Sequence, residues 1–248
     1  MRDLVYPPVI GFAKTAFKVL DLKFQLTGTE NVPRTGGAVI AINHISYVDF
    51  ILGGYGALPS KRLVRFMAKE SLFRNRYSGP LMRGMHHISV DRSAGAASYQ
   101  QALGYLAAGE VVGVFPEATI SRSFELKEFK SGTVRMAAEA AVPVIPMILW
   151  GTQRMLTKDH PRDFSRHRTI AITVGEPMTV SSDDDPTKAT EELRSTMAGM
   201  LDRTIRAYPE QPPGAWWLPE SYGGSAPTPE EAERLDQEEL ARRAARKK

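Results

Sequence analysis

Short uninterrupted runs of apolar residues recur along the middle of the chain, separated by polar loops and longer helical patterns. Such runs are typical of strands that are buried on both faces of a sheet. The runs that we interpret as strands are residues 38–42, 63–68, 87–90, 111–115, 142–150 and 169–174. Pro143 and Pro146 lie in the fifth run and favour an edge or irregular strand, because proline donates no ladder hydrogen bond.

Helical patterns fill the intervals between these runs, at residues 47–58, 94–108 and 132–141. The second is rich in alanine, starts at Ser93 and stops near Gly109. Strands that alternate with helices predict an α/β domain with a mainly parallel central sheet flanked by helices. Ligands of such sheets bind beyond the carboxyl ends of the strands, so we expect the functional residues in the loops that follow them.

The two ends of the chain differ in composition from this central part, for which we expect a catalytic domain over residues 31–207. Residues 1–30 contain a charge-free apolar stretch before Lys14 and Lys18. A transmembrane helix needs about 20 apolar residues, so this stretch predicts instead an amphipathic helix that either lies in a membrane interface or caps the core. Residues 208–248, rich first in proline and glycine and then in charge, predict an extended wrap and a solvent-facing helix.

Composition and charge exclude some kinds of site and point to an anionic binding partner. The 248 residues include no cysteine, which excludes disulfides, zinc–thiolate sites and a cysteine nucleophile. The formal charge of +4 is uneven, because seven cations and the single acid Glu70 alternate with large apolar residues between Lys61 and Arg83. This segment suits an anionic lipid surface or, less specifically, nucleic acid; a solvated helix face beside ordinary core residues is the alternative.

His44 and Asp49 form the first candidate site. His44 follows the strand at 38–42, and Asp49 falls in the first turn of the next helix. This spacing lets the carboxylate contact one imidazole nitrogen while the other faces a cleft, which suits a general base acting on an alcohol. Ser46 and Asp49 also match a capping box, which is the structural alternative.

Two further loops carry groups that bind anions. Asp91-Arg92 stands at a strand-to-helix junction, where a guanidinium and helix amides suit a phosphate, although a surface ion pair is the bland alternative. The loop after the strand at 111–115 and the start of the following helix offer a carboxylate, hydroxyls and cations close together. These groups include Glu117, Thr119, Arg122 and Lys130.

Four short blocks, in this order and rough spacing across residues 35–150, resemble the glycerolipid acyltransferase family and in particular its lysophosphatidic acid acyltransferase branch. The blocks are the His-x4-Asp motif, a block that ends in Asp91-Arg92, Phe115-Pro116-Glu117, and Val142-Pro143-Val144-Ile145-Pro146. Four ordered motifs are far more specific than any one of them. The resemblance implies an acyltransferase of the His-x4-Asp type with an N-terminal interfacial segment.

The resemblance also implies a reaction: the hydroxyl of lysophosphatidic acid attacks a long-chain acyl thioester and gives phosphatidic acid for phospholipid synthesis. His44 is then the base and Asp49 its orienting partner. The acyl donor is a co-substrate, either acyl-CoA or acyl carrier protein, and no cofactor or metal ion is expected. The expected phosphate-binding positions are Arg92, Glu117 and Thr119 from the resemblance, and Arg122 and Lys130 from their place in the sequence.

Two positions depart from the family pattern Phe-Pro-Glu-Gly-Thr-Arg-Ser. Ala118 replaces the glycine, and its side chain disfavours a positive φ. Ile120 replaces the arginine, so one guanidinium that could bind phosphate is lost. Arg122 is the candidate replacement. Lysophosphatidic acid is therefore the leading acceptor, with glycerol 3-phosphate or another lysophospholipid as the alternative.

The expected location is the cytoplasmic face of the cell membrane, where a peripheral or monotopic protein contacts an anionic lipid surface; no nucleic acid is expected. A different hypothesis, a non-catalytic basic module that binds membrane or nucleic acid through residues 61–83, predicts binding without turnover. A hydrolase that uses His44 is a third hypothesis, but the Gly-x-Ser-x-Gly nucleophile elbow is absent.

Overall fold

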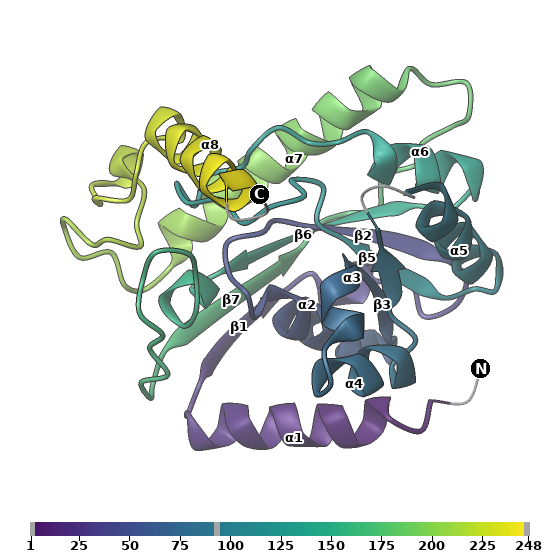
Figure 1. The fold of residues 1–248 in the computed structure, drawn as a ribbon, viewed down its shortest axis with the longest axis horizontal. Helices are drawn as coiled ribbons and strands as arrows, with labels where there is room; N and C mark the ends of the chain where they lie inside the picture. Colours follow the sequence, from purple (N-terminus) through teal and green to yellow (C-terminus); the bar gives the residue numbers. More distant parts are fainter. Residues whose placement is uncertain (1–2, 92–94, 246–248) are drawn as a thin grey trace.

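The computed structural model describes residues 3–91 and 95–245, and within them a seven-stranded sheet forms the centre of the fold (Figure 1). The strands are β1 (Lys23–Thr27), β2 (Ala38–Ile42), β3 (Val64–Lys69), β4 (Ile88–Val90), β5 (Val111–Val114), β6 (Val144–Trp150) and β7 (Thr169–Val174). Their order is β1-β7-β6-β2-β5-β3-β4, and of these neighbours β6 and β7 alone pair antiparallel. The expected α/β fold with a mainly parallel sheet is confirmed.

Helices cover the sheet on both faces. The helices are α1 (Tyr6–Val19), α2 (Asp49–Ala57), α3 (Glu70–Arg74), α4 (Ser78–Gly84), α5 (Gly95–Ala107), α6 (Gly132–Glu139), α7 (Pro186–Ala207) and α8 (Pro229–Ala245). Short 3-10 turns lie at Thr29–Asn31, Leu58–Ser60, Thr152–Arg154 and Glu220–Tyr222. The three helices expected between strands form within a few residues of their expected ends; Ser93, the expected start of α5, lies outside the described residues.

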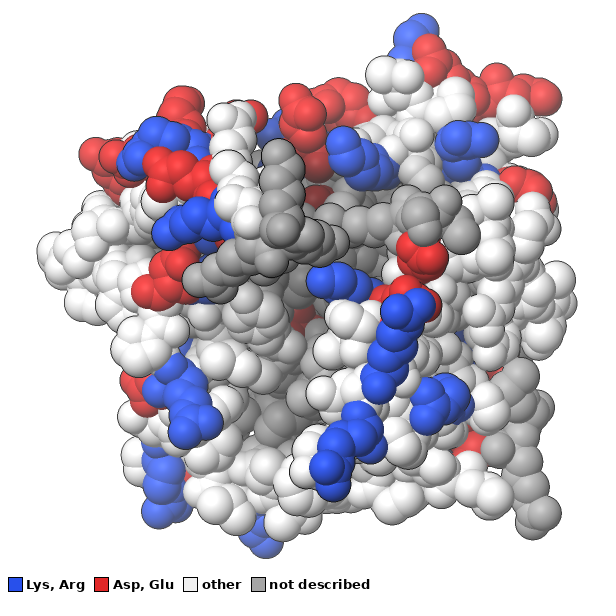
Figure 2. Space-filling model, viewed as in Figure 1, with Lys and Arg blue, Asp and Glu red and all other residues white. Residues whose placement is uncertain are grey.

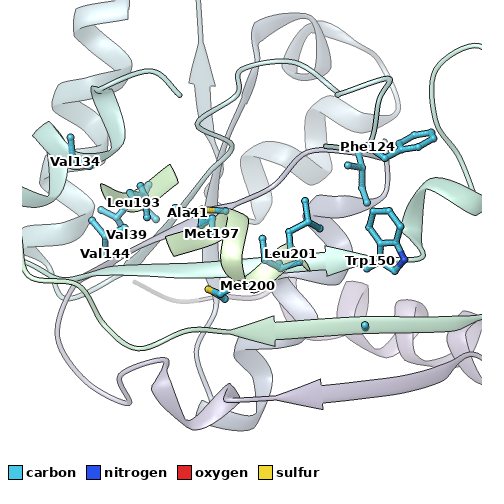
Figure 3. Packing of buried hydrophobic residues seen from close by; sticks show 14 of the residues in the cluster. Val39, Ala41, Phe124, Val134, Val144, Trp150, Leu193, Met197, Met200 and Leu201 are labelled. Carbon is cyan, nitrogen blue, oxygen red and sulfur yellow. The ribbon is translucent and has the colours of Figure 1, made fainter. Parts of the chain in front are cut away.

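Strand β2 shows why the central run is wholly apolar. All five of its residues are buried, because successive side chains point to opposite faces of a sheet that is covered on both. Val39 and Ala41 join the core that includes α5, α6 and α7. Ala38, Ile40 and Ile42 join the other core, which includes residues of α1 and α2. Figure 3 shows the first of these cores from close by.

Helix α7 is the longest element on that first face, and its apolar residues follow helical spacing. Leu193, Met197 and Leu201 are buried and lie in one cluster with Val39 and Val144 of the sheet (Figure 3). The start of the helix is fixed by Asp185, whose side chain accepts a hydrogen bond from the amide of Thr187, and by a proline in the first turn.

Strand β6 lies between β2 and β7, so our expectation of an edge or irregular strand is wrong. Pro143 precedes the strand. Pro146 is tolerated inside it because antiparallel pairing with β7 begins only at the next residue, Met147, opposite Val174. The carbonyl of Pro146 still accepts a hydrogen bond from Gly175 at 2.8 Å.

The apolar pattern does not predict β1, α3, α4 or α7. Strand β1 is mostly exposed, yet it pairs in parallel with β7 from Lys23 opposite Thr169 to Thr27 opposite Thr173. The sheet therefore begins before residue 31, where we expected the catalytic domain to start. At the other end of the chain, a segment containing buried Trp217 packs on the first core and leads to α8.

Candidate active site

His44 and Asp49 meet at the carboxyl end of β2. Nδ1 of His44 lies 3.0 Å from Oδ2 of Asp49, and Asp49 is fully buried in the first turn of α2. The same Oδ2 accepts the backbone amides of Ile45 and Ser46, each at 2.7 Å, while Oδ1 accepts Oγ1 of Thr152 at 2.6 Å. Four donors therefore fix the position of this carboxylate.

Only one of the two hydrogen bonds of a capping box is present between Ser46 and Asp49. Asp49 accepts the amide of Ser46, as the acid of a capping box does. The Ser46 hydroxyl, in contrast, donates to the carbonyl of Leu156 at 2.6 Å and accepts the amide of Val48 at 3.2 Å. Asp49 thus holds both the loop that precedes α2 and the imidazole of His44.

The ring of His44 is held in a fixed orientation. It stacks on Phe115, with ring centroids 4.2 Å apart and planes inclined by 24°. Because a carboxylate only accepts hydrogen bonds, neutral His44 carries its hydrogen on Nδ1 and presents a lone pair at Nε2. With 21% of the side chain exposed, the imidazole is accessible yet constrained, as a general base must be.

Glu117 lies beneath the backbone of this loop and is almost fully buried. Its Oε1 accepts the amide of His44 at 2.8 Å, and its Oε2 accepts the amide of Lys127 at 3.0 Å. Burial raises the pKa of the Glu117 carboxyl to about 7, against the lowering effect of these two amides. We expected Glu117 at the acceptor's phosphate, whereas its contacts are with the backbone that positions His44.

The other expected phosphate-binding residues are placed differently from one another. Oγ1 of Thr119 accepts Nζ of Lys127 at 2.9 Å. Arg122 is buried and forms ion pairs with three carboxylates. Lys130 is exposed, and its amide closes the loop by donating to Pro116. Arg92 lies outside the described residues.

The loop between β5 and α6 contains strained backbone. Ala118 has φ +60° and Phe124 has φ +61°, in the left-handed region that favours glycine. The amide of Ala118 donates to the carbonyl of Phe115, so a tight turn directly follows β5. The backbone therefore keeps the conformation suited to glycine although this sequence has alanine. Ile120, which replaces the family's arginine, is buried.

Two residues that support the site were absent from the sequence interpretation. Thr152 lies in the 3-10 turn after β6 and contacts Asp49. Asn43 pairs with the backbone of Leu149 in both directions, at 3.0 and 2.7 Å, and so ties the residue before His44 to β6. The signal for Thr152 was its place after a strand, because parallel strands bring their carboxyl ends to one edge of the sheet.

An apolar pocket that is partly open to solvent lies between α1, α2 and the sheet, with a cavity volume of about 60 Å³. Residues that line it include Val9, Phe17, Phe50, Tyr55 and Phe66. Phe66 stacks on Phe115, with ring centroids 6.1 Å apart, and Phe115 stacks in turn on His44. A chain of aromatic contacts thus connects the cavity wall with the candidate base.

The cations between residues 61 and 83 serve two purposes. Arg62 and Arg65 are buried; Arg62 donates to backbone carbonyls, and Arg65 pairs with Asp3 and Glu110. The exposed ones are Lys61, Lys69, Arg74, Arg76 and Arg83. Figure 2 shows basic side chains gathered over the region of α3 and α4.

The described residues contain neither a candidate membrane span nor a metal-binding cluster. Within residues 3–91 and 95–245, no helix combines the length and apolar character needed to cross a membrane. The same residues contain no group of three or more His, Asp or Glu side chains arranged as metal ligands.

Comparison with known proteins gives concordant results. A family model described as Acyltransferase matches residues 23–150. The 1-acyl-sn-glycerol-3-phosphate acyltransferase of Bacillus subtilis is 32% identical over 171 residues, which cover 67% of this chain and 81% of the relative. The relative of the same name from Borreliella burgdorferi is 29% identical, and the match covers 59% of this chain and 58% of the relative.

A solved structure shares the fold. The crystal structure of the 1-acyl-sn-glycerophosphate (LPA) acyltransferase PlsC from Thermotoga maritima superimposes with a TM-score of 0.68 at 21% sequence identity, and the match covers 82% of this chain and 80% of that one. At that identity the likeness concerns the fold alone.

Proposed function

The chain belongs to the acyltransferase family, and on that premise we propose that it transfers a long-chain acyl group from a thioester to the free hydroxyl of lysophosphatidic acid, giving phosphatidic acid. The observation that carries this proposal is the contact between His44 and Asp49 at the carboxyl end of β2, where Thr152 and two backbone amides also donate to the carboxylate. The names of the relatives support the acceptor.

In the proposed reaction, Nε2 of His44 accepts the proton of the acceptor's hydroxyl as the hydroxyl oxygen bonds to the thioester carbonyl carbon. The tetrahedral intermediate then collapses, the carbon–sulfur bond breaks, and the thiolate takes the proton back from the imidazolium. Asp49 stabilises the imidazolium and holds the tautomer, as in catalytic triads. General-base catalysis of this kind contributes about 10²- to 10⁴-fold to the rate.

The apolar cavity between α1 and α2 supports a long-chain substrate. Apolar side chains dominate its lining, and the stacked rings of Phe66 and Phe115 connect it with His44. We propose that part of an acyl chain occupies this pocket while the thioester carbon lies at Nε2. The donor is either acyl-CoA or acyl carrier protein, because both present the same thioester.

We propose that Arg92, Thr119, Arg122 and Lys130 bind the acceptor's phosphate. For Glu117 the contacts support a positioning role, because both of its oxygens hold backbone amides of the active-site loops. In this proposal Arg122 replaces the family's arginine, because Ile120 is buried and offers no polar group.

A peripheral location on the cytoplasmic face of the membrane completes the proposal. Exposed apolar residues support it, including Phe12 on α1 with 77% exposure and Tyr77 near α4 with 72% exposure. The exposed cations of α3 and α4 add attraction to anionic headgroups, about 1 kcal/mol each.

The test is release of free thiol from long-chain acyl-CoA, measured without acceptor and with lysophosphatidic acid, glycerol 3-phosphate or another lysophospholipid. Thiol release that requires lysophosphatidic acid, with phosphatidic acid found by mass spectrometry, is the expected result. Activity with another acceptor alone would reassign the substrate, and no release with any acceptor would favour a non-catalytic module.

His44→Ala should abolish this activity in a folded protein. His167→Ala is a matched control, because His167 is exposed and its ring contacts Asp21 rather than the catalytic pair. Undiminished turnover in the His44→Ala protein would remove the basis of the mechanism.

A further inference from the structure

Arg122, Lys127 and Lys158 form a cation cluster that the C-terminal helix covers. Arg122 pairs with Asp236 and, at 2.8 Å, with Glu239. Lys127 and Lys158 contact the two oxygens of Asp236 at 2.5 and 2.9 Å. Both acids lie on α8, so these contacts join positions more than 70 residues apart in the sequence.

The cation cluster is connected directly to the loops of the candidate active site. The amide of Lys127 donates to Glu117, whose other oxygen holds the amide of His44. The amide of Ser121, the residue before Arg122, donates to the carbonyl of His44 at 2.7 Å. The cluster and the catalytic base are therefore held by the same short loops.

The charges of the cation cluster balance only while α8 is in place. Its three cations face three carboxylates, those of Asp236, Glu239 and Asp159, the last of which pairs with Arg122 at 2.5 Å. Without the two acids of α8, Asp159 is the one carboxylate among the described residues that still pairs with these three cations, so positive charge is in excess there even with Glu117 close to Lys127. A phosphate monoester, with about −1.5 to −2 charges at neutral pH, has the complementary charge.

We propose that Arg122, Lys127 and Lys158 are a binding site for a phosphate monoester, and that Asp236 and Glu239 occupy this site as an internal competitor. The proposal rests on the proposed function for its ligand, the phosphate of a glycerolipid acceptor. Acceptor binding displaces α8, and docking of α8 excludes the acceptor. Lys127 and Lys158 thereby join Arg122 as groups that bind the headgroup.

The contacts of α8 suit a helix that is displaced by an anion. Its described inward face includes Ala232, Leu235, Asp236 and Glu239, of which Ala232 is buried and the other three are half-buried. Ion pairs rather than apolar contacts therefore hold most of this face. Figure 1 shows α8 on the outside of the fold, and Figure 2 shows acidic and basic side chains crowded over it.

The segment before α8 is anchored independently, so the helix can leave without unfolding it. Trp217 and Leu218 are buried. The guanidinium of Arg154 also lies over the ring of Trp217, 4.4 Å from its centroid. Helix α8 also carries its own cap, because Thr228 and Glu231 exchange hydrogen bonds at 3.1 and 3.3 Å.

The first experiment measures binding of glycerol 3-phosphate to the full-length protein by calorimetry. Asp236→Asn combined with Glu239→Gln should bind about tenfold more tightly than the wild type, because the competing carboxylates are gone. The control combines Glu230→Gln with Glu238→Gln, which changes the charge of the same helix equally at exposed positions away from the cation cluster. Equal affinities of the wild type and the Asp236/Glu239 variant would overturn the proposal.

Adding Lys158→Met to the Asp236→Asn/Glu239→Gln protein tests the cations themselves. Affinity should then fall by about tenfold, since a charged hydrogen-bond donor is lost. Unchanged affinity would show that the phosphate binds elsewhere. Inorganic phosphate and lysophosphatidic acid in neutral phosphatidylcholine vesicles are the other two ligands, and their relative affinities show whether the site serves free phosphate or a lipid headgroup.

A second measurement needs no variant. Amide hydrogen exchange in α8 of the wild-type protein should accelerate when glycerol 3-phosphate is added at constant ionic strength, because an undocked helix of this length is marginally stable in water. Exchange that ignores a saturating ligand would overturn the competition between α8 and phosphate.

These measurements separate the two proposals. Phosphate binding that displaces α8 in a protein without acyl transfer would defeat the proposed function and leave the binding site. Acyl transfer to lysophosphatidic acid with an unchanged KM in the Asp236→Asn/Glu239→Gln protein would keep the function and defeat the competition.

Discussion

Thr152 donates a hydrogen bond from Oγ1 to Oδ1 of Asp49 at 2.6 Å, although the two residues are 103 positions apart. Both side chains are fully buried, so this bond has no solvent substitute. Thr152 therefore orients the carboxylate that orients His44, and it is a positioning residue.

Thr152→Val should lower kcat by about tenfold with little change in KM, because the unpaired Oδ1 loosens the carboxylate without touching substrate. Thr152→Ser retains the hydroxyl and should keep most of the activity. The measurement is steady-state thiol release at varied acceptor concentration. A rise in KM alone, or equal losses in both variants, would contradict a positioning role.

Asp49→Asn should lower kcat by at least about 10²-fold, because an amide no longer stabilises the imidazolium and fixes the tautomer less well. The same assay measures it, with Asp202→Asn on α7 as the control for loss of a carboxylate; Asp202 pairs with Arg206 on the surface. Wild-type activity in the folded Asp49→Asn protein would refute the assignment of Asp49.

Ala118→Gly should stabilise the protein by up to about 1 kcal/mol, because φ +60° is strained for alanine and free for glycine. Ala97→Gly, at an exposed position inside α5, should instead destabilise it by about 1 kcal/mol. Urea unfolding of the three proteins gives the comparison. Equal destabilisation by both substitutions would show that the turn at Ala118 is unstrained.

Glu117 should make stability fall as pH rises from about 4.5 to 7. Burial raises its pKa to about 7 in the folded protein from an ordinary value of 4.5, so within this range the unfolded chain loses the proton that the folded chain retains. Below the range both states are protonated, and above it both are ionised, so this contribution is constant there.

The measurement is the unfolding free energy of the wild type minus that of Glu117→Gln as a function of pH. The side-chain amide of the Glu117→Gln variant faces two backbone N–H donors and costs some stability, but this cost does not depend on pH and so leaves the pH slope of the difference unchanged. A difference that stays flat between pH 4.5 and 7 would mean that the carboxyl ionises normally despite its burial.

Flotation with anionic liposomes should decrease as salt is raised, because exposed cations supply part of the attraction. Arg74→Gln with Arg76→Gln should weaken flotation, and adding Phe12→Ser on α1 should weaken it further. Arg203→Gln with Arg206→Gln is the matched control, since α7 covers the opposite face of the sheet from α1. Retention that ignores salt, or absence of flotation at low salt, would refute peripheral attachment.

The sequence by itself determined the features that depend on neighbouring residues. Five consecutive apolar residues predicted β2 within its observed bounds, since burial on both faces leaves no polar position. His44 and Asp49 meet within one loop and one helical turn, so their spacing alone predicted the contact. The departure at Ala118 was visible in the local motif, although its side chain disfavours the positive φ that the backbone adopts there.

The tertiary structure decided the partners of the remaining groups. Glu117 contacts the amide of His44 across 73 positions, and Arg122 contacts Asp236 across 114, distances at which residue spacing carries no information. The central place of β6 was also outside the reach of a local rule, because a proline penalty depends on which neighbour the missing N–H would face. A buried charge must find its partner wherever the fold supplies one, and so the sequence shows which groups need partners while only the packed chain assigns them.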